Sequence, residues 1–193
     1  MKQKIINIYS FKELDESARE KVVDKFRIDQ DINFEFAIDE FKSQLSNDFG
    51  IKNPSILFSG FYSQGDGACF TCDNIDLTKF CAALKIKSKF KTLLKYSDDY
   101  IQIRIKHNHR YYHERSTDTS IDFSPTYLAD KTIIAVEKQL ANFELIFEEW
   151  ALAKCKEIYK ALQDENDFQT SNETIIETIE ANNYEFDEYG NIA

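Results

Sequence analysis

The feature that most constrains the fold is a long amphipathic segment in the C-terminal half of the chain, covering roughly residues 127–163. Its large apolar residues recur every three or four positions, which places them on one face of a helix. These residues are Val136, Leu140, Phe143, Phe147 and Trp150. The spacing predicts one long helix, and we expect this helix to be the scaffold of the core.

Two hairpins are predicted upstream of this segment. Residues 100–106 alternate isoleucine or tyrosine with polar side chains, which is typical of a half-buried antiparallel strand. Residues 109–121 fit its partner strand, with a tight turn at His107-Asn108. Residues 54–72 predict a second hairpin, joined through a glycine-rich turn.

The rest of the chain predicts one more strand and shorter helices. Ser or Thr followed three residues later by Glu forms a capping box, which marks the start of a helix. The predicted elements are a strand over residues 3–9, a helix opened by Ser10 and Glu13, a helix from Asp31 to near Gly50, a Lys-rich helix over residues 77–96, and a short helix opened by Thr170 and Glu173.

These elements predict an α+β fold: an antiparallel sheet of four to five strands packed against several helices, including the long helix of the C-terminal half. A chain of 193 residues, 42% of them hydrophobic, lies within the usual span of one compact domain. We therefore expect a single domain over residues 1–193, with residues 184–193 as a peripheral tail.

Hydropathy and charge limit the partners that such a protein can have. The N-terminus lacks the apolar stretch of a signal peptide, and no segment approaches the ~20 apolar residues of a membrane span. We expect a cytoplasmic protein that does not bind membranes. The net charge of -10 disfavours bulk nucleic acid as a partner. Residues 85–115 nevertheless carry nine Lys or Arg against three Asp or Glu, and this basic band suits a phosphorylated small molecule or an acidic protein surface.

The cysteines and histidines do not predict a metal site. Cys69 and Cys72 have the CxxC spacing, but residues three apart on a strand point to opposite faces. His109 and His113 would lie ~13 Å apart on a strand, too far to share one metal ion. We expect reduced, buried thiols, no metal and no cofactor.

Two features are candidates for ligand binding. The segment 59–67 concentrates glycine and small polar residues, so it is either a tight turn or a loop whose backbone N–H groups meet an anion. The segment 109–114 combines basic, aromatic and acidic side chains. The candidate ligand-binding residues are Tyr62, Gln64, Gly65, Asp66, Gly67, Arg104, Lys106, His109, Arg110, Tyr111, Tyr112, His113 and Glu114.

Four stretches, in order over almost the whole chain, resemble a family that is widespread in phages, prophages and plasmids. The stretches are residues 8–14 with Ala18, residues 58–70 (FSGFYSQGDGACF), residues 110–114 with Thr117 and Asp118, and residues 177–186. Members of this family are often labelled antitoxin-like proteins of toxin–antitoxin stability systems. The resemblance implies a protein partner, either a toxin or a host defence factor, and it implies no catalytic residues.

Three functions follow from these observations. We expect a non-enzymatic accessory protein of a phage or mobile element that binds and neutralises a toxin or a host defence factor. The first alternative is a binder of a phosphorylated small molecule such as a nucleotide signal, which would use Gly65, Gly67, Arg104, Lys106 and Arg110. The second alternative is a hydrolase or nuclease that would use His109, His113, Glu114 and Asp118.

Overall fold

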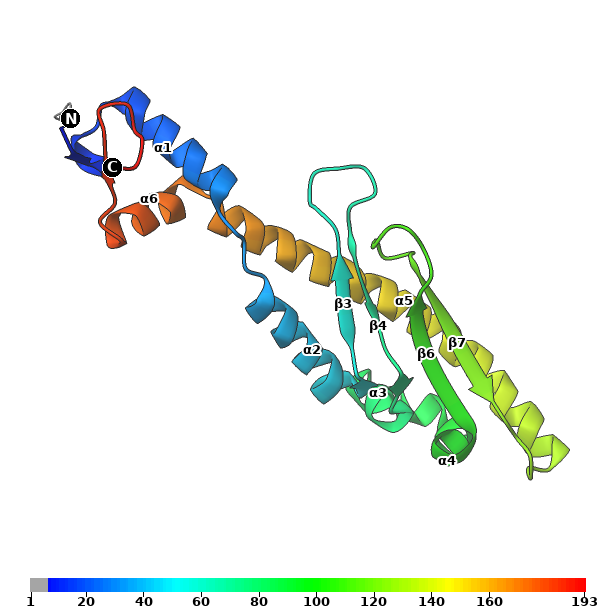
Figure 1. Cartoon of the computed structure of the whole chain (residues 1–193). Helices are drawn as coiled ribbons and strands as arrows, with labels where there is room; N and C mark the ends of the chain where they lie inside the picture. Colours follow the sequence, from blue (N-terminus) through cyan, green and yellow to red (C-terminus); the bar gives the residue numbers. More distant parts are fainter. Residues whose placement is uncertain (1–6) are drawn as a thin grey trace, which may run out of the picture. The chain divides into compact units, whose positions relative to one another are not determined.

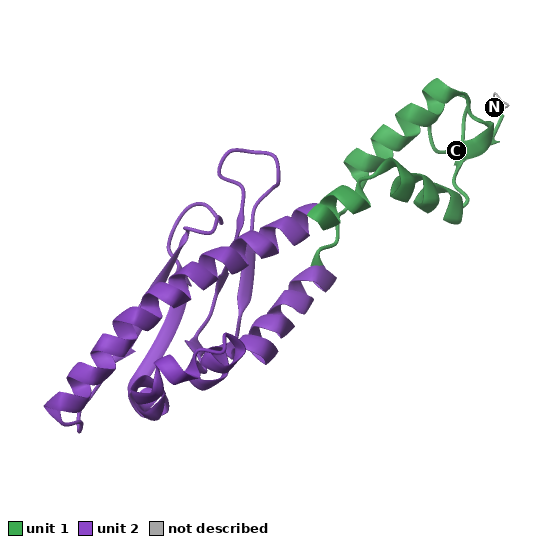
Figure 2. Ribbon diagram, turned by 180° about the vertical axis from the view of Figure 1, so that it is seen from behind, with its two compact units in different colours: residues 1–34, 164–193 green, residues 35–163 purple. Residues whose placement is uncertain are grey.

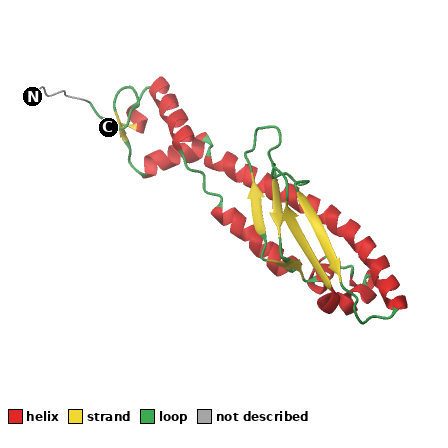
Figure 3. Cartoon of the chain, turned by 45° about the vertical axis from the view of Figure 1, so that its right-hand side comes forward, coloured by secondary structure: helices red, strands yellow, loops and turns green. Residues whose placement is uncertain are grey.

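The computed structural model describes residues 7–193, which form two compact units (Figure 2). Residues 7–34 and 164–193 form the first unit, and residues 35–163 form the second. The prediction of a mixed fold is confirmed, because helices and short antiparallel strand pairs occur together (Figure 3). The prediction of one domain stays a prediction. Most of the strand predicted over residues 3–9 lies outside the described residues.

Both ends of the chain build the first unit. Strand β1 (Tyr9–Ser10) pairs antiparallel with β8 (Glu185–Phe186). Beside this pair lie the 3-10 turn Phe11–Glu13 and the helices α1 (Glu16–Asp29) and α6 (Asn172–Ala181). The unit is closed by a core of eight buried side chains, which are Phe11, Leu14, Ala18, Val22, Val23, Ile175, Ile179 and Phe186.

Two predictions change in this unit. Phe186 belongs to the segment that we predicted to be peripheral, yet its side chain is 0% exposed. The predicted capping box is present, since the Ser10 amide donates to Glu13 Oε2 at 2.8 Å, but it opens only the 3-10 turn. Helix α1 begins later, where the Asp15 carboxylate accepts from the amide of Ala18 at 2.7 Å.

The second unit contains three strand pairs and the remaining helices. Among the described residues, no helix combines the length and the apolar character needed to cross a membrane. The elements are α2 (Glu35–Phe49), β2 (Ile51–Lys52), β3 (Ser55–Phe58), β4 (Ala68–Thr71), β5 (Asn74–Ile75), α3 (Leu77–Ala83), the 3-10 turn Lys87–Lys89, α4 (Lys91–Tyr100), β6 (Ile101–His107), β7 (Thr117–Phe123) and α5 (Asp130–Gln169), whose last turns belong to the first unit.

The strands of the second unit pair two by two instead of forming one ladder of four to five strands. The pairs are β2 with β5, β3 with β4, and β6 with β7. A single bridge joins two of these pairs: the amide of Cys72 donates to the Ile105 carbonyl at 3.0 Å, and the amide of Ile105 donates to the Cys72 carbonyl at 3.1 Å. The chain then turns away, because the amide of Asp73 donates to Lys52. Only one residue of this segment is therefore left to pair with β6.

Helix α5 runs along one face of these strands (Figure 1) and contributes buried side chains to the core along its length. The predicted long helix is confirmed, over residues 130–169 instead of 127–163, and Phe143 and Phe147 are 0% exposed. Aromatic side chains from different elements meet there, with the rings of Phe80 and Trp150 4.9 Å apart in an edge-on arrangement. This contact fixes α5 against α3.

The Lys-rich helix predicted over residues 77–96 is broken in the structure. Helix α3 ends at Ala83, the chain passes through a left-handed residue at Lys85 (φ 59°), and α4 begins only at Lys91. Lys85 to Phe90 is the part whose alternating pattern matches a strand better than a helix. The break therefore lies where the helical periodicity of the sequence fails.

Candidate functional site

The two segments singled out in the sequence lie against each other. The glycine loop (residues 59–67) joins β3 to β4, and the His/Tyr loop (residues 108–116) joins β6 to β7. Both extend from the same end of their strand pairs (Figure 1). A Cβ atom placed on Gly65 would lie 3.2 Å from the Tyr111 ring, and one on Gly67 would lie 2.6 Å from the Cα of His113. We call this composite surface the paired loops.

The glycine loop is held by its own carboxylate. Asp66 Oδ2 accepts hydrogen bonds from the backbone amides of Tyr62, at 3.0 Å, and Ser63, at 2.7 Å. The carboxylate thus places a negative charge inside the loop, which disfavours an anionic ligand there. Gly67 is buried against His113, so its lack of a side chain serves the contact between loops.

The His/Tyr loop is not the strand that we predicted over residues 109–121. His113 Nδ1 accepts from the amide of Arg115 at 3.1 Å, and the amide of Ser116 donates to the His113 carbonyl at 2.9 Å. His107 Nε2 lies 3.1 Å from the carbonyl oxygen of Tyr111. These local hydrogen bonds turn the backbone away from β6. Pairing with β6 resumes at Thr117, directly opposite His107.

The third histidine lies beside a different group. His109 Nε2 is 3.6 Å from Asp118 Oδ1, and Asn108 Nδ2 donates to Asp118 Oδ2 at 2.7 Å. The hydrogen bond from Asn108, followed by the interaction with His109, lowers the pKa of the Asp118 carboxyl. His109 and His113 therefore contact separate partners. Within residues 7–193, no group of three or more His, Cys, Asp or Glu residues is placed to hold a metal ion.

The outward side of the paired loops is aromatic and basic. Tyr62 is 76% exposed and Tyr111 is 50% exposed. The Arg110 guanidinium lies 5.7 Å from the centre of the Tyr111 ring. Gln64, Lys106 and His109 are exposed as well.

Two other predicted residues do not belong to this outward side. Arg104 lies on β6 and donates to Asp122 at 2.7 Å, so its guanidinium is already paired with a carboxylate of β7. Tyr112 is half-buried, with its ring 4.8 Å from the ring of His107. Tyr112, like His113, supports the loop from within.

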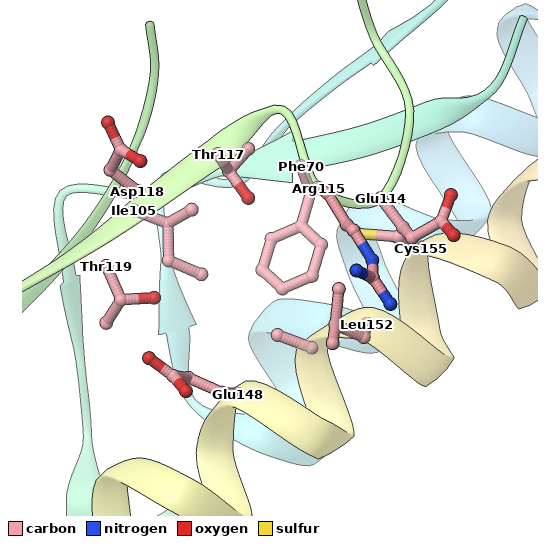
Figure 4. Close-up of a pocket in the computed structure, with 11 residues that line it drawn as sticks. Phe70, Ile105, Glu114, Arg115, Thr117, Asp118, Thr119, Glu148, Leu152 and Cys155 are labelled. Carbon is pink, nitrogen blue, oxygen red and sulfur yellow. The ribbon is translucent and has the colours of Figure 1, made fainter. Parts of the chain in front are cut away.

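A pocket of about 340 Å³ lies between the strands and α5, next to the His/Tyr loop (Figure 4). Among the thirteen predicted residues only Glu114 lines it, and Glu114 Oε1 lies 3.9 Å from Lys156 Nζ. The sequence did not reveal the pocket, because its walls come from separate segments that are far apart in the chain. Counting Phe70 on β4 and Ile105 on β6 separately, the segments are four, and the remaining lining residues are Glu114, Arg115, Thr117, Asp118 and Thr119 from the His/Tyr loop and β7, and Glu148, Ala151, Leu152 and Cys155 from α5.

The cysteines are buried free thiols, as predicted. Burial raises the pKa of Cys155, which lines the pocket, to about 11 and that of Cys69 to about 12. It likewise raises the pKa of Cys72 and of Cys81 to about 11. Such thiols stay protonated near neutral pH and are poor nucleophiles there.

Comparison with known proteins adds one match. A family model described as a domain of unknown function (DUF8835) matches residues 33–172. The matched segment contains the whole second unit, including both loops and the pocket. No curated protein and no solved structure shows a significant match to the chain.

Proposed function

Because this chain belongs to the DUF8835 family, whose function is unknown, we propose a function from the geometry of its own paired loops. The proposal is a non-enzymatic accessory protein of a phage or mobile element, acting in the cytoplasm. It binds and neutralises a protein partner, either a toxin or a host defence factor, through the outward side of the paired loops.

The observation that carries this proposal is that, within the paired loops, one set of residues holds the backbone in place and another set is exposed on the surface. Gly67, Asp66 and His113 hold the backbone from inside, while Tyr62 and Tyr111 are presented outward on that support. Tyrosine and arginine dominate the binding energy of protein interfaces because they combine large contact areas with polar groups. A surface held in place before binding loses less entropy when a partner docks.

The resemblance to antitoxin-like proteins supports the class of partner. Its four stretches meet two by two in the structure. Residues 8–14 and 177–186 pair through Tyr9 and Phe186 in the first unit. Residues 58–70 and 110–114 meet at the contact between Gly67 and His113. The segments that carry the resemblance therefore form two local structures, one of which is the proposed binding surface.

The same geometry weighs against the two alternatives. A phosphorylated ligand in the glycine loop would meet the negative charge of the Asp66 carboxylate, which is held there by two backbone amides. It would also need the guanidinium of Arg104, which is paired with Asp122. A histidine-dependent hydrolase would need its histidines to act on one reacting centre, whereas His113 bonds to the backbone of Arg115.

The proposal is tested by quantitative capture of partners from cells that carry the native mobile element. The wild-type chain is compared with a double variant, Tyr62→Ala with Tyr111→Ala. We expect a stoichiometric protein partner whose affinity falls at least about 30-fold in the double variant, because even one hot-spot tyrosine contributes about 2 kcal/mol or more. The partner alone should be toxic or defensive when expressed, and co-expression of the wild-type chain should relieve that effect.

The matched control is Tyr127→Ala, since Tyr127 is 89% exposed and lies outside both loops. This variant should retain the partner and its neutralisation. Equal loss of the partner in the control and the double variant, or neutralisation that survives the double variant, would contradict the proposal.

A further inference from the structure

The pocket beside the His/Tyr loop has an apolar floor and a charged rim, and this inference rests on the proposed function. Phe70, Ile105 and Leu152 supply apolar surface from β4, β6 and α5. In Figure 4, the Phe70 ring lies at the centre, Glu148 reaches from α5 toward Thr119, and Arg115 reaches from the loop toward α5. A cavity of about 340 Å³ has room for one long side chain and lies near the lower end of the range for ligand pockets.

The charges of the rim favour a cation. Three carboxylates line the pocket, from Glu114, Asp118 and Glu148, against one guanidinium, from Arg115. Within residues 7–193, Glu148 has no hydrogen bond or ion pair, and Glu114 has only the 3.9 Å approach of Lys156. A positive group placed there would gain charge-assisted hydrogen bonds that the chain itself does not supply.

The pocket is also continuous with the proposed binding surface. Glu114 and Arg115 belong to the His/Tyr loop, the loop that presents Arg110 and Tyr111 outward. A protein that covers the paired loops would therefore reach the pocket without contacting a second site. Pockets of this kind receive the anchor residues of protein interfaces, which fill them with one side chain.

We propose that this pocket is the anchor site for one lysine or arginine side chain of the partner protein. The aliphatic stem of that side chain lies on Phe70, Ile105 and Leu152, and its cationic head bonds to Glu148. Arginine suits the site best, because a guanidinium can bond to a carboxylate through two parallel N–H groups. Arg115 opposes the incoming charge and must move aside.

The experiment uses small probes on the full chain, so it does not depend on knowing the partner. N-acetyl-arginine amide and N-acetyl-lysine amide are titrated while the methyl NMR signals of Thr119, Ala151 and Leu152 are followed. N-acetyl-norleucine amide is the neutral control probe, and N-acetyl-glutamate amide is the anionic one. We expect saturable shifts with a roughly millimolar Kd for the cationic probes, since one side chain offers few contacts.

Three substitutions test the assignment. Glu148→Gln should weaken the arginine probe about tenfold, because it removes one charge-assisted bond. The matched control Glu149→Gln should leave the Kd unchanged, since Glu149 is the next residue on α5 and does not line the pocket. Arg115→Gln should tighten binding, because it removes the opposing charge. Unchanged thermal unfolding midpoints confirm that the variants are folded.

The proposal is overturned if the cationic probes cause no saturable shift, if Glu148→Gln binds them as well as wild type, or if the neutral probe binds equally. Preferential binding of the anionic probe, lost in Arg115→Gln, would overturn it as well. The proposed function fails on a different result, namely partner capture that is unchanged when Tyr62 and Tyr111 are replaced. If the probes do not bind the pocket but capture still depends on these tyrosines, the anchor site is wrong and the proposed function is not contradicted.

Discussion

The glycine loop and the His/Tyr loop each contain nine residues (59–67 and 108–116), yet they are stabilised by different groups. In the glycine loop, the carboxylate of Asp66 gathers two backbone amides. In the His/Tyr loop, the imidazole of His113 accepts from the amide of Arg115. The contact between the loops is equally asymmetric. The glycine loop supplies space at Gly67, and the His/Tyr loop supplies the volume that fills it.

This difference shows that the glycines of the glycine loop allow the His/Tyr loop to pack closely against them. Glycine in a loop usually indicates a turn with positive φ or a close approach of a ligand. Gly65 has a φ of 94° and therefore meets the first description, but Gly67 is glycine because the backbone of another loop occupies the position of its Cβ. The comparison predicts that changes in either loop are transmitted to the other, and by different amounts.

The largest effect is expected for Gly67→Ala. The added Cβ would lie 2.6 Å from the Cα and Cβ of His113. This clash can be relieved only if the backbone of the His/Tyr loop moves. We expect the free energy of unfolding of the second unit to fall by about 1–3 kcal/mol, the usual range for overpacking. Denaturant unfolding measures it. The matched control is Gly60→Ala, whose Cβ would lie 3.2 Å from Asp66 Oδ2 and would displace that side chain slightly without meeting any backbone atom of the other loop. Equal losses in both variants would show that the loops are not packed as described.

A smaller effect is expected for Asp66→Ala. The substitution leaves the amides of Tyr62 and Ser63 without their acceptor, so we expect a loss of about 1–2 kcal/mol. Asp66→Asn should recover part of it, because an amide oxygen still accepts. Hydrogen exchange at these two amides is the direct measurement. Exchange rates that stay unchanged in Asp66→Ala would contradict the assigned role of the carboxylate.

The His/Tyr loop should respond more weakly to the loss of its own acceptor. His113→Ala removes the ring that accepts from Arg115, a neutral hydrogen bond, and should cost about 0.5–1.5 kcal/mol. His109→Ala should change stability by less than about 0.5 kcal/mol, because the ring is exposed. Both values come from denaturant unfolding. A larger loss for His109→Ala than for His113→Ala would reverse the assignment of the two histidines.

The effect that is smallest near neutral pH, and that grows only at alkaline pH, concerns the cysteines beneath the two loops. Burial raises the pKa of Cys69, on β4 after the glycine loop, to about 12, and that of Cys155, beside the His/Tyr loop, to about 11. Both folded-state values lie above the ordinary thiol value of 9.0. The thiols therefore favour the folded state fully below pH 9, and this contribution is lost as the pH rises toward 11.

Iodoacetamide labelling across this pH range, read by peptide mass spectrometry, tests that order. We expect little labelling of either thiol in the folded protein at pH 8, and labelling of Cys155 at a lower pH than Cys69. Labelling of both near pH 9, as for free thiols, would show that the base of the loops is open to solvent.

Much of the secondary structure could be predicted from the sequence because it depends on local chemistry. The apolar spacing of Phe143 and Phe147 predicts α5, the alternation of residues 101–106 predicts β6, and a glycine at position 50, with φ 71°, ends α2. The predictions failed where local hydrogen bonds compete with the alternation of side chains. Residues 109–116 alternate well enough for a strand, yet the hydrogen bonds of His113 close them into a loop.

The candidate site likewise has features that could be predicted from the sequence and features that could not. The sequence by itself determined which side chains the two loops carry, because the residue types of a loop can be read from that segment alone. It thereby determined the Tyr- and Arg-rich chemistry of a binding surface. Only the tertiary structure decided that Gly67 makes room for His113, and that Glu148 faces the strands across a pocket. Both depend on how two separate strand pairs and α5 dock. That docking results from the summed burial of many apolar side chains, which no single segment of the sequence records.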